Sequence, residues 1–145
     1  MVSVELFGPL DAALGDVMAW VVLALAVINI GTRLVAHRQH VKQAEEDGAE
    51  AISRHPVHQA SLVLLVLASF YYTTLHQHGG VVVSTLVAGV FLSDFFEFEA
   101  RKVEARRDVP LDRPKGSIAA GMLVLAYAGY QALFFLIEGP VGAII

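Results

Sequence analysis

Arg33, Asp94 and Glu97 are the residues whose types and positions in this sequence point most directly to chemistry. Each lies inside or at the edge of a long apolar stretch. Ionisable side chains within a membrane are costly, and they usually pair with one another or handle ions. Glu97 also precedes Arg101 by four residues, the favourable order for a pair on one helix face. We therefore expect Arg33 to pair with Asp94, with Glu97 as a second partner.

This cluster has two interpretations. The favoured one is a structural ion pair near the inner face of a membrane, where water and long side chains reduce the cost of the charges. The alternative is a proton or cation pathway that uses Asp94 and Glu97. Four short spans are few for a transporter, so this alternative requires an oligomer.

The six histidines come in three pairs: His37 and His40, His55 and His58, His76 and His78. Two histidines three residues apart on a helix can hold one edge of a metal site. All six flank the apolar runs, however, where we expect solvated or interfacial histidines, and the chain has no cysteine. We therefore predict no metal and no cofactor, while metal binding by the pairs stays an open alternative.

Signatures of other activities are weak. Without cysteine, disulfides, thiolate metal sites and thiol catalysis are excluded. The serines lack a nearby base that would activate them, and no glycine loop has the pattern of a phosphate-binding site. A net charge of −4 with only 10 basic residues argues against nucleic acid as a partner. We expect a protein that is not an enzyme and has no catalytic residues.

The distribution of charge predicts the elements that hold these residues. Asp, Glu, Lys and Arg are absent from residues 17–32, 55–93 and 116–137. A membrane-spanning helix needs about 20 mainly apolar residues, so the middle run is long enough for two. The sequence HQHGG at 76–80 divides it with a tight turn. The sequence predicts an all-α, four-helix transmembrane bundle in one domain, 1–145, with spans over about 14–36, 57–75, 81–100 and 115–137.

The depth of Asp94 follows from this division. If the third span begins at Val81, Asp94 lies about 20 Å further along the helix axis. That places it in the inner third of a hydrocarbon layer about 30 Å thick. No helix breaker follows until Pro110, so we expect the first and third helices to extend beyond the membrane into the cytoplasm. One stripe of the third helix carries Asp94, Glu97, Arg101, Glu104 and Asp108.

The orientation follows from the basic residues. All 10 lie within 33–54 and 101–115. Basic loops stay in the cytoplasm, which makes loops 37–56 and 101–114 cytoplasmic and both termini extracellular. The first 16 residues contain three acids and no base. A secretory signal peptide has a basic start, so the first apolar run is predicted to be a retained span.

Small residues at intervals of four indicate which helix faces pack closely. On the third span these are Thr85, Gly89 and Ser93. On the fourth span they are the pairs Ser117 with Gly121 and Ala128 with Ala132. Such spacing is common in membrane helices and identifies no activity.

Three stretches, TRLVAHRQHVKQAEED, SDFFEFEARKVEARRDVPLDRPKGS and LVLAYAGYQALFFLI, resemble a small family of integral membrane proteins from halophilic archaea. The resemblance covers most of the chain and implies a membrane location and such a host, but no catalytic activity. We expect a structural or accessory component in the lipid bilayer that packs with itself or with a larger membrane complex. Proton or cation transport as an oligomer is the alternative.

Overall fold

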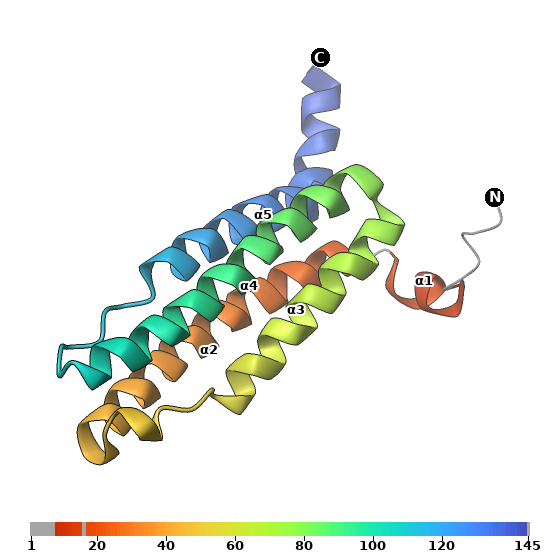
Figure 1. Cartoon of the computed structure of the whole chain (residues 1–145). Coiled ribbons are helices and arrows are strands. Elements are labelled where there is room, and N and C mark those ends of the chain that lie inside the picture. The colour runs from red at the N-terminus through yellow and green to blue at the C-terminus, as the bar shows by residue number, and fades with distance from the viewer. Residues whose placement is uncertain (1–7, 16, 145) are drawn as a thin grey trace.

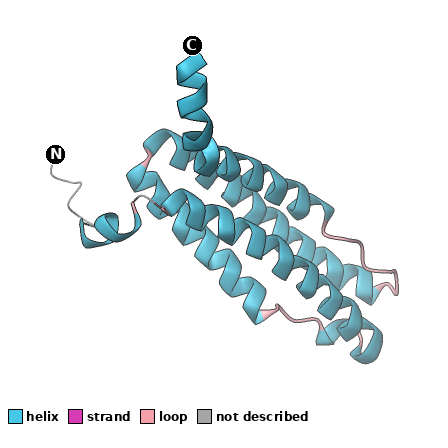
Figure 2. Cartoon of the chain, turned by 180° about the vertical axis from the view of Figure 1, so that it is seen from behind, coloured by secondary structure: helices cyan, strands magenta, loops and turns pink. Residues whose placement is uncertain are grey.

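The computed structural model describes residues 8–15 and 17–144, without the side chains of residues 10 and 135–144. In this part of the chain the regular structure is helical throughout (Figures 1 and 2). The elements are α1 (Gly8–Leu14), α2 (Met18–Asp47), the short 3-10 helix η2 (Ala49–Ala51), α3 (Pro56–Leu75), α4 (Gln77–Arg106) and α5 (Lys115–Ile144).

Four of these helices form a bundle, which confirms the predicted all-α fold. Helices α2 and α4 each pack mainly against α3 and α5, so α2 and α4 face each other across the diagonal. Neighbours run antiparallel, as short connections require. The last part of α5 bends away from the bundle (Figures 1 and 2).

Local chemistry fixes where the helices begin and end. Helix α2 ends at Gly48, whose φ of 87° suits glycine better than any other residue. Pro56 stands in the first turn of α3, where its missing N–H costs nothing. The Nδ1 atom of His55, the residue before it, accepts a hydrogen bond from the His58 backbone N–H at 3.3 Å. Helix α3 therefore begins one residue before the predicted span over about 57–75.

The turn between α3 and α4 is tighter than the predicted five-residue turn. A single residue, His76, separates the two helices, and Gly79 and Gly80 belong to the first turn of α4. A Cβ atom on Gly80 would lie 2.2 Å from the Thr73 Cα. The glycine is therefore used for a close approach of two backbones, not for a wide turn.

The lengths of helices α2 and α4 agree with the prediction that the first and third helices are long and end in charged segments. Helices α2 and α4 have 30 residues each and continue without a break into strongly charged segments. Helix α1 was not predicted, because seven residues are too few to show a helical period. It is held beside α3 by the Tyr71 hydroxyl, which donates to Asp11 Oδ1 at 2.5 Å.

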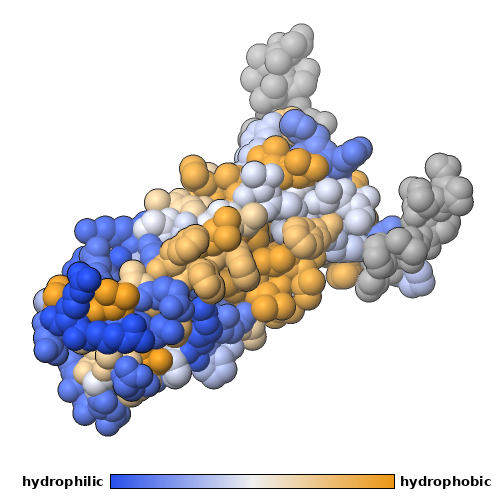
Figure 3. Space-filling view, in the orientation of Figure 1, coloured by the Kyte–Doolittle hydropathy of each residue, from blue (hydrophilic) through white to orange (hydrophobic). Residues whose placement is uncertain are grey.

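The bundle has two ends of different character. We call the end formed by residues 37–56 and 101–114 the charged end, and the end with the α3–α4 turn the turn end. Hydrophilic residues gather at the charged end, and a hydrophobic zone covers the middle of the molecule (Figure 3).

The buried side chains also differ between the turn end and the charged end. Towards the turn end most of the buried side chains are apolar: Val22, Ala26, Leu65, Val83, Val87, Val124 and Ala128 are each no more than 3% exposed. Ser69 is a buried polar exception, and its hydroxyl donates to the Val66 carbonyl at 2.8 Å. Towards the charged end, buried polar and charged side chains take their place. The bundle is thus a packed apolar half joined to a polar half.

Candidate functional site

The buried polar residues of each helix are three or four positions apart, so they share one helix face and lie at a similar depth in the bundle. Asn29 and Arg33 are one turn apart on α2, so they share a face. His58 and Ser61 are likewise three residues apart on α3. With Asp94 of α4 these side chains are all 5% exposed or less, which means that they face the interior and not the lipid. We call Asn29, Thr32, Arg33, His58, Ser61 and Asp94 the polar layer.

Arg33 and Asp94 meet across the bundle diagonal. Arg33 Nε lies 3.5 Å from Asp94 Oδ1, within the 4 Å expected of a direct pair. The guanidinium is further held by Nη1, which donates to Asn29 Oδ1 at 2.8 Å. The long arginine side chain is what allows α2 to reach α4 although the two helices are not packed neighbours.

His58 is the second partner of Asp94, a contact that was not predicted from the sequence. Its Nε2 atom lies 2.9 Å from Asp94 Oδ1, and its Nδ1 atom lies 2.8 Å from the Thr32 hydroxyl. The side chain is 3% exposed, so the expectation that all six histidines are solvated or interfacial is wrong for His58. The sequence did contain an indication that His58 is buried, because His58, Ser61 and Leu65 have the i, i+3, i+7 spacing of a buried helix face.

Hydroxyl and amide groups complete the polar layer. Asn29 Nδ2 donates to Ser61 Oγ at 2.9 Å, and the Ser61 hydroxyl donates to the His58 carbonyl at 2.9 Å. The Thr32 hydroxyl lies 2.9 Å from Ser61 Oγ and 3.0 Å from the Asn29 carbonyl. Buried polar groups need such partners, since an unmet donor or acceptor costs about 1–3 kcal/mol.

Glu97 has a different partner from the one expected. Its Oε2 atom accepts from the backbone N–H groups of Gly116 at 2.8 Å and Ser117 at 3.2 Å. Its Oε1 atom accepts from the Ser117 hydroxyl. A helix start carries free N–H groups and partial positive charge, and here it binds the carboxylate. The structure therefore joins Arg33 to Asp94, and Glu97 to the beginning of α5.

The rest of the charged stripe on α4 is also used within the chain. The Glu104 carboxylate accepts from the backbone N–H of Asp112 at 3.2 Å. Arg101 is 4% exposed, and its Nη1 atom donates to His40 Nδ1 at 3.2 Å. From Asp94 to Glu104 this stripe packs against the loop before α5 and the adjoining part of α2. Asp108 was predicted to continue the stripe, but α4 ends at Arg106, and Asp108 lies beyond that end with a φ of 56° and is exposed.

His40 is the second histidine that the sequence analysis misplaced, since it is 2% exposed. A guanidinium can only donate, so His40 Nδ1 must accept the bond from Arg101. Its Nε2 atom then carries the proton and donates to the Ser53 carbonyl at 2.9 Å. His40 is therefore neutral in this arrangement, and it adds no charge to that of Arg101.

The polar layer is suited to holding a proton. Intramembrane acids often serve in proton relays, and here the Asp94 carboxylate is hydrogen-bonded to His58. Among the side chains that the structure describes, no three His, Asp or Glu residues are grouped so that they could hold a metal ion.

Four helices, each long and apolar enough to cross a membrane, close around this ionic cluster. The fold and the site together define a multi-pass α-helical membrane protein. The chain belongs to the family of a domain of unknown function, DUF7313, whose model matches residues 2–145. No curated protein and no solved structure matches the chain. The family membership agrees with the expected likeness to membrane proteins without an assigned activity.

Proposed function

We propose that this protein is a non-enzymatic membrane component that associates with a second copy of itself through the face formed by α3 and α4. One observation carries the proposal: an apolar groove runs between these two helices on the surface that faces lipid. We call it the α3–α4 groove. Its residues are Val66, Phe70, Ser84, Val87, Ala88, Phe91 and Leu92.

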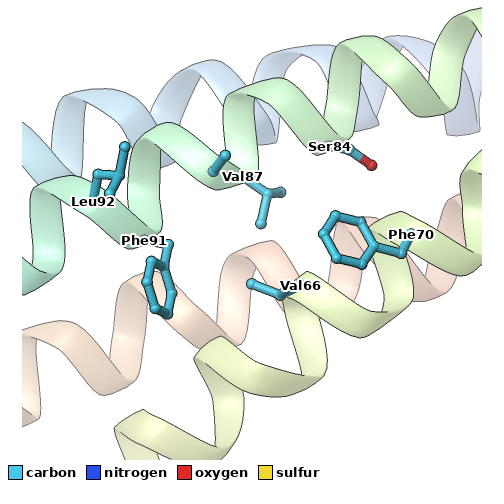
Figure 4. Close-up of a pocket in the computed structure, with 7 residues that line it drawn as sticks. Val66, Phe70, Ser84, Val87, Phe91 and Leu92 are labelled. Atoms are coloured by element: carbon cyan, nitrogen blue, oxygen red, sulfur yellow. The ribbon is translucent and has the colours of Figure 1, made fainter.

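The groove has room for side chains of another helix. Its volume is about 280 Å³, and Phe70 and Phe91 stand at its two ends (Figure 4). A second hollow of about 490 Å³ adjoins it and shares Phe70, Ser84 and Ala88. Lipid tails are as apolar as these side chains, so helix association in a membrane depends on close packing of complementary shapes.

The small residues of α4 lie beside the groove and face outward. A Cβ atom on Gly89 would meet no heavy atom within 4 Å, and Thr85 is exposed. The Thr85 hydroxyl donates to the Val81 carbonyl, so it can lie in lipid without an unmet donor. By contrast, Ser117 and Ala128 of α5 are buried inside the bundle. The Thr85–Gly89–Ser93 repeat is therefore open to a helix from outside, and the same face on a second copy is complementary to it.

Cysteine cross-linking in the native membrane tests this proposal cleanly, because the chain has no cysteine. Under mild oxidation, the Ala88→Cys variant should form a cross-linked dimer. The matched control is Leu123→Cys on α5, which is 59% exposed but lies outside the groove, and it should stay monomeric. Adding Gly89→Leu, which fills the face, should abolish the Ala88→Cys product.

Three results would count against self-association. No product from Ala88→Cys would indicate that a lipid chain fills the groove. Equal products from Ala88→Cys and Leu123→Cys would indicate random collisions. A cross-link from Ala88→Cys to a protein of another mass would replace the second copy with a larger membrane complex.

Proton or cation transport is the second candidate, and the buried His58–Asp94 hydrogen bond favours it. In this second candidate function Asp94 is the acid that would carry the ion, because Glu97 binds the start of α5. In liposomes, Asp94→Asn should reduce proton flux if the acid carries it. Flux no higher than in empty liposomes would remove this candidate and leave association unaffected.

We also propose that the charged end is cytoplasmic and that both termini are extracellular. The support is the confinement of all 10 basic residues to 33–54 and 101–115. A halophilic archaeal host is proposed on the resemblance of the quoted segments alone.

A further inference from the structure

We propose that water enters the bundle from the charged end and reaches His58 and Asp94, which makes this pair a protonation site open to that side only. The inference deepens the second candidate function by naming the ion as a proton and the side from which it comes. It begins with donors inside the bundle that have no acceptor.

The two buried arginines supply these donors. Among the described residues, Nη2 of Arg33 and both Nε and Nη2 of Arg101 have no partner, and Arg33 Nε lies 3.5 Å from Asp94 Oδ1 without forming a hydrogen bond. Nη2 bears two N–H groups and Nε bears one, so two N–H groups on Arg33 and three on Arg101 lack an acceptor. Both side chains are at least 96% buried, since they are 1% and 4% exposed. Buried water commonly satisfies polar groups of this kind, and about three hydrogen bonds per water is typical.

An anion is a poorer partner for these donors than water. Asp94 already lies 3.5 Å from Arg33 Nε. Glu97 and Glu104 stand on the same stripe of α4 as Arg101, at four residues before it and three after it. Three carboxylates therefore already surround the two guanidiniums, and an added anion would face these carboxylates. Neutral water meets the need for acceptors without adding charge.

An entrance for water is present at the charged end. A hollow of about 100 Å³ opens there, enough for a few water molecules at about 30 Å³ each. Its lining includes Arg101 and Glu97. Asp94 is two helical turns further into the bundle than Arg101, about 10 Å along the axis. The unpartnered N–H groups of Arg101 and Arg33 lie along this interval and provide successive sites for water.

The other half of the bundle closes the route. On the turn-end side of the polar layer, each of the four helices contributes a buried apolar side chain: Ala26, Leu65, Val87 and Val124. These side chains are 3% exposed or less, and they belong to one continuous hydrophobic cluster. Such a dry layer offers water no hydrogen-bond partner, so water stops at the polar layer.

The hydrogen bonds at His58 suit two protonation states. In the neutral ring, the Thr32 hydroxyl can donate to Nδ1, from which it is 2.8 Å away. In the protonated ring, Nδ1–H donates to the Thr32 oxygen, and the hydroxyl proton turns to the Asn29 carbonyl at 3.0 Å. Nε2–H donates to Asp94 in both states. Gain of a proton therefore requires only the rotation of one hydroxyl.

The charges around His58 come from two helices. Helix α2 contributes Arg33 and, nearer the charged end, His40, which is neutral. Helix α4 contributes Asp94, and Glu97 and Arg101 lie further along it. Helix α5 faces this region with Ser117 and Gly121, neither of which titrates.

Silver ions test the access, because they are small, follow water and block thiols. In the full-length protein, Ser61→Cys places a thiol in the polar layer, and Ala68→Cys places one two turns further along α3 in the apolar half. Vesicles of each orientation are treated with silver ions, and the remaining thiols are counted with a maleimide after unfolding in detergent. Thr32→Cys serves as a second polar-layer variant if Ser61→Cys does not fold.

We expect the polar-layer thiol to be blocked only in vesicles that expose the charged end, and Ala68→Cys to stay reactive towards maleimide in both. Blocking from neither side, blocking from the turn end, or equal blocking of Ala68→Cys would each overturn the inference. This outcome is independent of liposome flux, because a protein can bind protons from one side without transporting them.

Protonation of His58 can be followed by the ¹⁵N NMR signals of its ring. These signals are assigned as the ones that disappear in the His58→Gln variant. In oriented vesicles these signals should follow the pH on the charged-end side. Signals that follow the pH of the turn-end side, or that do not change between pH 5 and 8, where histidine normally titrates, would contradict the proposal.

Discussion

At the scale of single residues, Asp94 holds the polar half of the bundle together. It lies between Arg33 at 3.5 Å and His58 at 2.9 Å, and it is 4% exposed. In so buried a place each charge depends on the others, because a few water molecules do not replace a lost charged partner. Much of the cost of burying Arg33 is therefore compensated by this one carboxylate.

The Asp94→Ala change should lower the free energy of unfolding by about 3–5 kcal/mol, because it leaves a buried cation without its partner. Unfolding in mixed detergent micelles measures the loss. Glu50→Ala is the matched control, since it removes the partner of Arg106 at 3.7 Å in an exposed pair. That change should cost less than about 1 kcal/mol. Equal costs for the two variants would show that Arg33 does not depend on Asp94 as its partner.

Glu97 contributes to stability in another way, through the beginning of α5. Glu97→Ala removes the acceptor of two backbone N–H groups and one hydroxyl. We expect a loss of about 0.5–2 kcal/mol, the range for a lost helix cap. Hydrogen exchange should accelerate in the first turn of α5 and remain unchanged in α2. An equal acceleration in both helices would contradict the capping role.

At the scale of elements, the crossing of α3 and α4 depends on one glycine. The predicted tight turn of five residues is shortened to a single linking residue, His76, so the last turn of α3 and the first turn of α4 must approach each other closely. At Gly80 a side chain would meet the backbone of Thr73, which cannot move without shifting α3. This contact also fixes one end of the α3–α4 groove.

Gly80→Ala should therefore destabilise the bundle by about 1–3 kcal/mol, as overpacking does. Gly31→Ala is the control on α2, where an added Cβ would meet nothing within 4 Å. That variant should keep its stability or gain up to about 1 kcal/mol, because alanine favours the helix more than glycine. Thermal unfolding in detergent compares the two. A neutral Gly80→Ala variant would rule out the close approach.

At the scale of the whole molecule, the bundle could be predicted because charge-free runs near 20 residues long leave few other folds. The sequence named Arg33 and Asp94 because charges inside apolar runs stand out. The sequence could not predict that His58 pairs with Asp94, or that Glu97 binds the start of α5. Both contacts join helices that only tertiary packing brings together. The α3–α4 groove could not be predicted either. The small residues of α4 and α5 have the same spacing in the sequence, and only the packing shows that those of α5 are buried and those of α4 are open.

The orientation of the whole molecule is open to a direct test. A reporter fused to the C-terminus should be active only on the outer face of the membrane, because the basic loops keep the charged end in the cytoplasm. The control is the same reporter inserted at Gly48, in the exposed loop after α2, which should register the cytoplasm. A cytoplasmic signal from the C-terminal fusion would reverse the orientation that we propose.

Association through α3 and α4 is the central claim, and the mass of the purified particle tests it most directly. In a mild detergent, light scattering should give twice the mass of one chain for the wild type, and the mass of a single chain for Gly89→Leu. The variant should still be folded, since the added side chain points into open space. A wild-type particle with the mass of one chain at every concentration, with no other protein bound, would contradict the claim.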